Sequence, residues 1–288
     1  MLFFNSMTTS FATGFNYRNI IPLIISRRVD CLSTPTHENT VHAVSSNFPN
    51  RSNLLNIKPK ALSKSPTTGK YEYDPIILLS NVRTLVPKIG VIRLLVSQIN
   101  PDLLILTETW IGDTIGNNQI AIHNYNKLGR DIIEDSHGGT CFYMINNIKF
   151  NRLNDLEDDN VEVLWGQARP LGLHRGHHFL VDATVYHPPS ANNNQMLQYL
   201  TKWAIEVEGR YSGCGIIVKG DFDKLETKYF CRQFGFKQLV NVPSRTANTL
   251  DLVLANLGRF YHPNPIETYP PFRLSDDSII VIHPHERS

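Results

Sequence analysis

The sequence predicts an α/β protein of the α+β kind, in which two mixed sheets pack face to face and helices flank them. Short apolar runs alternate with helical patterns from Asp74 onward, which is typical of a packed domain of strands and helices. Strands outnumber long helical stripes, which disfavours a single doubly wound sheet with its many crossover helices. The composition, with 41% hydrophobic and 19% charged residues, excludes collagen-like, coiled-coil and wholly disordered chains.

The chain divides by composition into a leader, residues 1–72, and a folded domain, residues 73–288. Ser, Thr, Asn and Pro dominate from Ser33 to Thr68, which is typical of a disordered or low-complexity segment. The first 29 residues lack Asp and Glu, a weakly mitochondrial-like composition, although a disordered leader is the better interpretation. Residues 71–288 carry 20 Lys and Arg against 24 Asp and Glu, so we do not expect one broad basic face for duplex binding.

The eight predicted strands are short apolar runs, and the two predicted helices are stripes of apolar residues at spacings of three and four. The helices are Lys88 to Ile99, stopped by Pro101, and the stripe of Met196, Leu197, Leu200, Ala204 and Val207. The strands are Pro75 to Ser80, Leu103 to Leu106, Gly139 to Ile145, Val161 to Ala168, His178 to Tyr186, Gly215 to Val218, Leu250 to Leu254 and Ser278 to Ile282.

Neither a membrane span nor a cysteine framework is predicted. No run approaches the ~20 apolar residues that a spanning helix needs. Cys31, Cys141, Cys214 and Cys231 are widely spaced without a CxxC pair, so neither a disulfide scaffold nor a zinc module is indicated. We expect a reduced intracellular protein, nuclear or cytoplasmic, that makes no membrane contact.

Polar residues stand at the ends of the apolar strands: Asn81, Glu108, Tyr186, Asp221 and Asp276. Any one of them alone fits a solvated turn. Several carboxylates that meet at one rim of a sheet repel one another unless a cation lies between them. Hard oxygen ligands in this number favour Mg²⁺ or Mn²⁺ over zinc.

The motifs occur in a recognisable order. They are SNVRTL with Asn81, PDLLILTETW with Glu108, the pair Gly138 and Gly139, VYHPPS with Tyr186, VKGDFD with Asp221, PSRTANTLDLVL with Arg245 and Asp251, and LSDD with Asp276. The chain resembles the endonuclease/exonuclease/phosphatase superfamily over about residues 76–283, and most closely the apurinic-type endonuclease domain of non-LTR (LINE-like) retrotransposon reverse transcriptase proteins.

The resemblance implies a four-layer αββα sandwich, DNase I-like, that hydrolyses DNA phosphodiesters with Mg²⁺ or Mn²⁺. It also implies a monomer whose parent element carries a reverse transcriptase domain. Carried over by position, Glu108 would be the principal metal ligand, with Asp276 in support and Asn81 as a neighbouring ligand or phosphate contact. Tyr186 would donate to the phosphate, Asp221 would activate or position the water, Arg245 would bind substrate, and Asp251 would orient the residue after Asp276.

Two positions depart from the family pattern. The family's GDFN reads GDFD, which places Asp223 at the amide position, and its SDH reads SDD, which places Asp277 at the position of the catalytic histidine. Both changes add negative charge where a phosphodiester should bind, and loss of one fixed donor slows a reaction by ~10²–10³. We therefore expect impaired catalysis, together with a raised pKa for at least one of Asp251, Asp276 and Asp277.

Alternative interpretations remain open. The chain could be a catalytically inactive relic that at most binds metal or nucleic acid, or a hydrolase of small phosphoesters on the same scaffold. His174, His177 and His178 fit a turn better than a metal site, and the acidic run from Asp155 to Glu162 fits a solvated loop. The three tryptophans, Trp110, Trp165 and Trp203, fit a hydrophobic core better than a base-stacking platform.

Overall fold

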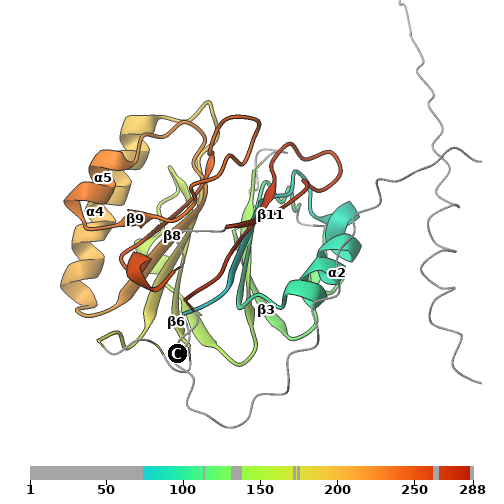
Figure 1. Ribbon diagram of the computed structural model, residues 1–288, viewed down its shortest axis with the longest axis horizontal. Helices are drawn as coiled ribbons and strands as arrows, with labels where there is room; N and C mark the ends of the chain where they lie inside the picture. Colours follow the sequence, from blue (N-terminus) through green and yellow to red (C-terminus); the bar gives the residue numbers. More distant parts are fainter. Residues whose placement is uncertain are drawn as a thin grey trace, which may run out of the picture. The chain divides into compact units, whose positions relative to one another are not determined.

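The computed structural model describes residues 74–112, 114–130, 138–170, 173, 176–261 and 266–285. The predicted leader, residues 1–72, lies outside the described residues. Two six-stranded sheets form the centre, and helices lie over their outer faces (Figure 1). The architecture is therefore the four-layer αββα sandwich of two mixed sheets that the sequence predicts.

The first sheet has the strand order β11-β12-β1-β2-β4-β3. Its strands are β1 (Ile77–Asn81), β2 (Leu103–Thr107), β3 (Tyr125–Arg130), β4 (Thr140–Ile145), β11 (Glu267–Tyr269) and β12 (Ile279–Ile282). β1 and β2 are parallel, with Asn81 opposite Thr107, and the other pairs are antiparallel. β1 and β2 therefore end at the same edge of the sheet.

The second sheet has the strand order β5-β6-β7-β8-β10-β9. Its strands are β5 (Lys149–Arg152), β6 (Glu162–Arg169), β7 (Leu180–Tyr186), β8 (Gly215–Asp221), β9 (Lys237–Gln238) and β10 (Asp251–Ala255). β7 and β8 are parallel, with Tyr186 opposite Asp221, and β10 runs antiparallel to β8 with Asp251 opposite Asp221.

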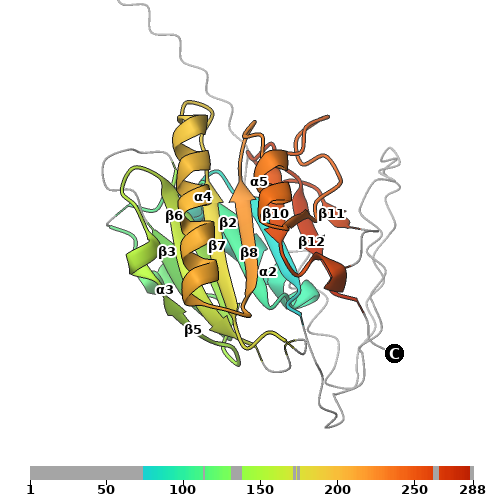
Figure 2. The same ribbon diagram turned by 90° about the vertical axis from the view of Figure 1, so that its left-hand side faces the viewer.

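Helices bury the outer face of each sheet. The helix α2 (Ile89–Ile99) sets Ile92 and Val96 against Leu78 and Leu104 of the first sheet. The helices α4 (Asn193–Arg210) and α5 (Lys228–Gln233) cover the second sheet, as Figure 2 shows with α4 in front of β6 and β7. The two inner faces share a third core. The central strands are consequently buried on both sides, which explains their unbroken apolar runs.

All eight predicted strands and both predicted helices are present, with ends that differ by one or two residues in most cases. α2 begins after a 3₁₀ turn at Val86–Lys88 and ends at Asn100, which has a left-handed φ of 52°, immediately before Pro101. The sequence missed four strands, β3, β5, β9 and β11, and these form the four edges of the two sheets. Edge strands are half exposed and polar, so they carry no continuous apolar signal.

The tryptophans divide between core and site. Trp165 of β6 and Trp203 of α4 pack edge to face with ring centroids 4.2 Å apart, so their predicted core role is confirmed. Trp110 is only partly buried and lines the cleft described below, so its prediction as a core residue is wrong. Among the described helices, none is both long enough and apolar enough to cross a membrane.

Candidate active site

The strand ends named from the sequence meet at one edge of the sandwich. β1 ends at Asn81, Glu108 follows β2, Tyr186 and Asp221 end neighbouring parallel strands, and Asp251 begins the strand antiparallel to β8. Asp276 and Asp277 lie shortly before β12, which is antiparallel to β1. Register thus brings together residues that are almost 200 positions apart in the chain.

Asn81 lies at the centre of this edge. Its side-chain Nδ2 donates to Glu108 Oε1 at 2.6 Å and to Asp221 Oδ2 at 2.9 Å, and so connects the two sheets. Its Oδ1 accepts from the backbone N–H of Arg83 at 3.2 Å, and Ser275 Oγ donates to its backbone carbonyl at 2.6 Å. With the amide in this orientation Asn81 is a donor that holds two carboxylates, and its predicted metal-ligand role would require the amide to turn over.

A cleft of about 300 Å³ opens in front of Asn81. Its walls come from the loops after β1 and β2, from the end of β7 and from the segments before β10 and β12. The lining residues are Asn81, Arg83, Glu108, Trp110, Tyr186, Arg245, Ser275, Asp276 and Asp277. At the rim, Arg83 and Asp276 form a long ion pair at 3.6 Å in which both side chains are more than half exposed.

The carboxylates behind the cleft are crowded and buried. Burial raises the pKa of Asp221 to about 6, with smaller contributions from the charges of Asp277 and Glu108. Burial likewise raises the pKa of Asp251 well above its ordinary value, and the charges of Asp221 and Asp277 add to this. The nearby Ser244 hydroxyl and the Arg245 charge offset only part of the shift. The pKa of Asp251 is thus raised in the predicted direction, but burial is the main cause and the crowding of carboxylates is secondary.

Tyr186 reaches the cleft from the end of β7. Burial raises the pKa of its phenol, and the charges of Glu108 and Asp221 raise it further. The hydroxyl therefore stays protonated at neutral pH and keeps a proton to donate. This agrees with a donor role toward a bound anion.

Asp277 differs from the sequence-based expectation. Arg245 Nε donates to Asp277 Oδ1 at 2.7 Å, and Arg245 Nη2 donates to Asp277 Oδ2, so the two side chains form a bidentate ion pair. The hydrogen bonds to Asp277 raise the pKa of the guanidinium above its usual range. The negative charge that the sequence places at Asp277 is present, but a guanidinium faces both of its oxygens and offsets it.

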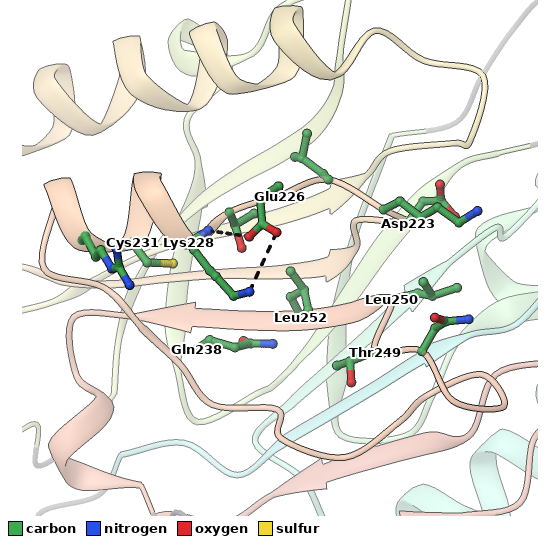
Figure 3. Close-up of a pocket in the computed structure, with 13 residues that line it drawn as sticks. Asp223, Glu226, Lys228, Cys231, Gln238, Thr249, Leu250 and Leu252 are labelled. Atoms are coloured by element: carbon green, nitrogen blue, oxygen red, sulfur yellow. Dashed lines mark hydrogen bonds and ion pairs between the residues drawn. The ribbon is translucent and has the colours of Figure 1, made fainter.

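The side chain of Asp223 does not lie at the cleft, where the family pattern places it. Its backbone N–H donates to Asp221 Oδ1 at 3.0 Å, and its φ of +45° turns the chain away after β8. Its side chain lines a neighbouring pocket of about 660 Å³, to which Glu226, Lys228, Cys231, Gln238, Thr249 and Leu252 also contribute (Figure 3). Asp223 therefore positions Asp221 through its backbone, and its carboxylate is not among the residues that line the cleft.

The backbone around the cleft is strained. Arg83, Glu108, Trp110, Asp223 and Leu274 all have positive φ, a conformation that is rare for residues with a side chain. Gly139 holds the turn after Glu108, since its carbonyl accepts from Thr109 N–H and a Cβ there would lie 2.6 Å from Thr109 Oγ1. This explains why the Gly-Gly pair accompanies the TETW motif.

Four residues of the site escaped the sequence interpretation: Arg83, Lys88, Trp110 and Ser275. Lys88 is only 6% exposed, and its ammonium donates to the carbonyls of Val82 and Arg83, which fixes the loop after β1. Burial lowers the pKa of this lysine. A lysine at the start of an apolar helix was the available signal, but the sequence offers no indication that its charge turns inward.

The other candidate clusters contribute no site. Within the described part of the chain, no three histidine, cysteine or carboxylate side chains are grouped closely enough to enclose a metal ion. His177 packs against Phe260 with ring centroids 6.3 Å apart, and His174 lies outside the described residues. In the acidic run Glu157 pairs with Arg152, and Asp155 pairs with Arg210.

Comparison with known proteins identifies the fold. No family profile matches the chain, and no curated protein matches it in sequence. An AP endonuclease from Leishmania major is similar in structure, with a TM-score of 0.57 and 14% identity over 73% of this chain and 88% of the other. The endonuclease domain of TRAS1, a telomere-specific non-LTR retrotransposon, has a TM-score of 0.53 and 11% identity over 73% and 98% of the two chains.

A third similar structure is the 3′ phosphatase NExo from Neisseria bound to a product DNA hairpin, with a TM-score of 0.52 and 12% identity over 74% of this chain and all of the other (100%). At these identities the likeness establishes the fold. The chain has the DNase I-like αββα fold that these structures share, as the sequence predicts.

Proposed function

We propose that the chain is a divalent-metal-dependent nuclease that hydrolyses DNA phosphodiesters, of the kind found in non-LTR retrotransposons. The observation that carries the proposal is the charge imbalance of the cleft. Three carboxylates, Glu108, Asp276 and Asp277, line the cleft together with the guanidinium groups of Arg83 and Arg245, and the carboxylates of Asp221 and Asp251 lie behind it. Even with Asp251 protonated and the nearby Lys88 ammonium counted, four carboxylates face three cations, and a divalent cation would offset the remaining negative charge.

The residues present suit Mg²⁺ or Mn²⁺. Glu108 and Asp276 offer hard oxygen donors at the cleft, and Asn81 stands beside them. Mg²⁺ retains several waters and is often bound through one or two carboxylates, so an enclosed cage of ligands is not required. A cation held there would supply positive charge to the phosphate oxygens during hydrolysis.

The chain's own residues supply the remaining chemistry. Asp221, positioned by Asn81 and by the Asp223 N–H, is the group that would accept a proton from the attacking water. The Tyr186 hydroxyl would donate to a non-bridging phosphate oxygen, and Arg245 would bind the same phosphate. Burial raises the pKa of Asp251 and so disfavours a second negative charge beside Asp221.

The proposal extends to the substrate and to the genetic element from which the chain derives. The motifs resemble an endonuclease domain of a retrotransposon, so we infer DNA as the substrate and an intracellular site of action, with a reverse transcriptase domain in the parent element. The similar TRAS1 domain and the DNA-bound NExo structure support this assignment.

Nicking of supercoiled plasmid by the full chain tests the function. We expect nicking with Mg²⁺ or Mn²⁺, no nicking in EDTA, and loss in Glu108→Gln. The matched control is Glu208→Gln, an exposed glutamate on α4 remote from the cleft, which should nick like wild type. A folded wild-type chain that binds Mn²⁺ without cutting DNA would favour the inactive relic. Hydrolysis of small phosphoesters without nicking would favour the phosphatase alternative.

A further inference from the structure

The ion pair between Arg245 and Asp277 is built differently on its two sides. Both residues line the cleft, but the side chain of Asp277 is only 1% exposed, whereas that of Arg245 is 34% exposed. The guanidinium is therefore the accessible partner of the pair, and it presents positive charge to the space where a phosphate would bind. The pair has little net charge, but its orientation directs a cation into the cleft.

Both partners are held by rigid backbone. Arg245 sits in a tight turn closed by the Arg245 N–H to Asn248 carbonyl bond at 3.0 Å and its reciprocal at 2.8 Å. Ser244 Oγ accepts from the N–H groups of Leu250 and Asp251, which ties this turn to the start of β10. The Ser278 N–H donates to the Ser244 carbonyl at 2.8 Å and connects the turn to the segment that carries Asp277.

The ion pair with Asp277 uses only part of the hydrogen-bonding capacity of the Arg245 guanidinium. A guanidinium has five N–H groups, and the bidentate pair uses two of them, one on Nε and one on Nη2. Three donors then remain for the cleft. The other cation lining the cleft, Arg83, is 51% exposed in a 3.6 Å pair and is not fixed in this way.

We propose that Arg245, oriented by Asp277, is the fixed cation that holds the scissile phosphate and stabilises its developing charge. The inference rests on the proposed nuclease function and deepens it, because it assigns Asp277 as the positioning residue of an Arg–Asp pair. The chain then needs no histidine at position 277 for a positive charge on the phosphate side of the cleft.

Cleavage kinetics of the full chain with Mg²⁺ give the main test. Arg245→Ala should lower kcat by ~10²-fold and KM much less, since the charge is needed most in the transition state. Asp277→Asn keeps the size of the side chain but weakens the bidentate pair with Arg245, so its kcat should lie between those of Arg245→Ala and wild type. The matched control is Arg259→Ala, an exposed arginine stacked on Phe260, with wild-type kinetics expected. Equal kcat for Arg245→Ala and Arg259→Ala, both shown to be folded by circular dichroism, would overturn the proposal.

Chemical rescue separates a phosphate contact from a purely structural role. Guanidinium chloride, at concentrations that do not unfold the protein, should raise the rate of Arg245→Ala and leave Asp277→Asn and Arg259→Ala unchanged. Equal stimulation of all three variants would count against a specific contact.

If wild type cuts no DNA, the proposed function fails, and affinity alone then decides the role of Arg245. A fluorescein-labelled duplex is titrated in Ca²⁺ by anisotropy. Arg245→Ala should bind ~10-fold more weakly than Arg259→Ala, as expected when one charge-assisted hydrogen bond is removed. Equal affinities would refute the phosphate contact.

Discussion

Two ion pairs, each formed by an aspartate and a cationic side chain, lie at different depths in the protein and differ in whether the cation reaches the cleft. Lys219 and Asp182 lie on neighbouring strands in the space between the sheets, with side chains 0% and 1% exposed, and the Lys219 ammonium lies 5.5 Å from the centre of the Phe142 ring. Arg245 and Asp277 lie at the edge of the same space, and there the cation reaches the cleft. The side chains of the first pair are closed off from solvent, whereas both residues of the second pair line the cleft.

The deep pair is a strained electrostatic element. Burial lowers the pKa of Lys219 and raises that of Asp182, and each partner's charge offsets only part of the other's shift. Among the described residues, Asp182 Oδ2 has no hydrogen-bond partner. Desolvation of two ions can exceed their attraction, so we expect this pair to contribute little net stability.

The largest expected effect is on this deep pair. Lys219→Met leaves a buried carboxylate without its cation and should lower the free energy of unfolding by ~3–5 kcal/mol. The double variant Asp182→Leu/Lys219→Met removes both charges and should recover most of that loss. Urea unfolding measures all forms, with Asp182→Leu as the second single variant. If the double variant were as unstable as either single variant, the change in volume and packing, rather than charge, would explain the loss.

Asp74 can be compared with the aspartates of the two ion pairs, because it is a buried carboxylate whose pKa is raised, to about 6, by burial alone. A raised folded-state pKa means stability that is fully present below the ordinary value of 3.8 and is lost as pH rises through 6. Asp74→Asn should therefore be more stable than wild type at pH ~8 by up to ~3 kcal/mol and equal to it below pH ~4. Urea unfolding across this range measures the difference, with the exposed Asp159→Asn as a control expected to show none. A pH-independent difference would contradict this account.

The sequence predicted which residues form the candidate site better than it predicted which of those residues pair with each other. Asn81, Glu108, Tyr186 and Asp221 could be placed because apolar strands end in polar residues and the register aligns those ends, whereas Asp251 came from the family resemblance. The Arg245–Asp277 pair could not, since it depends on a turn closed by backbone bonds and joins residues 32 positions apart. Edge strands such as β5 and β11 escaped for a related reason, because exposed strands carry no apolar pattern.

Asp277→His decides between the sequence pattern and the structure. The family pattern predicts that a histidine here, with Asp223→Asn, raises the rate by at least ~10²-fold. The structure predicts the opposite for Asp277→His, because an imidazole cannot accept two hydrogen bonds from Arg245 and would release the guanidinium. We expect kcat to fall ~10-fold, or ~1.4 kcal/mol. Single-turnover cleavage measures it, and a rate increase would show that Arg245 is dispensable once the histidine is present.

The smallest expected effect concerns the exposed pair of the neighbouring pocket, Lys228 and Glu226, which are 3.9 Å apart with side chains 81% and 71% exposed (Figure 3). Water screens such a pair, so Lys228→Ala should change the free energy of unfolding by less than ~0.5 kcal/mol.

Lys224 and Arg232 also line this pocket, and Leu250 connects it to the start of β10. A DNA strand that leaves the cleft in this direction would meet their charges, and removing one lysine that neutralises a phosphate should reduce the salt slope of binding by ~0.9. Anisotropy titrations at several salt concentrations measure that slope. A slope unchanged in Lys228→Ala would mean that the DNA leaves the cleft by another side, while the stability result would still show that an ion pair contributes little once water surrounds it.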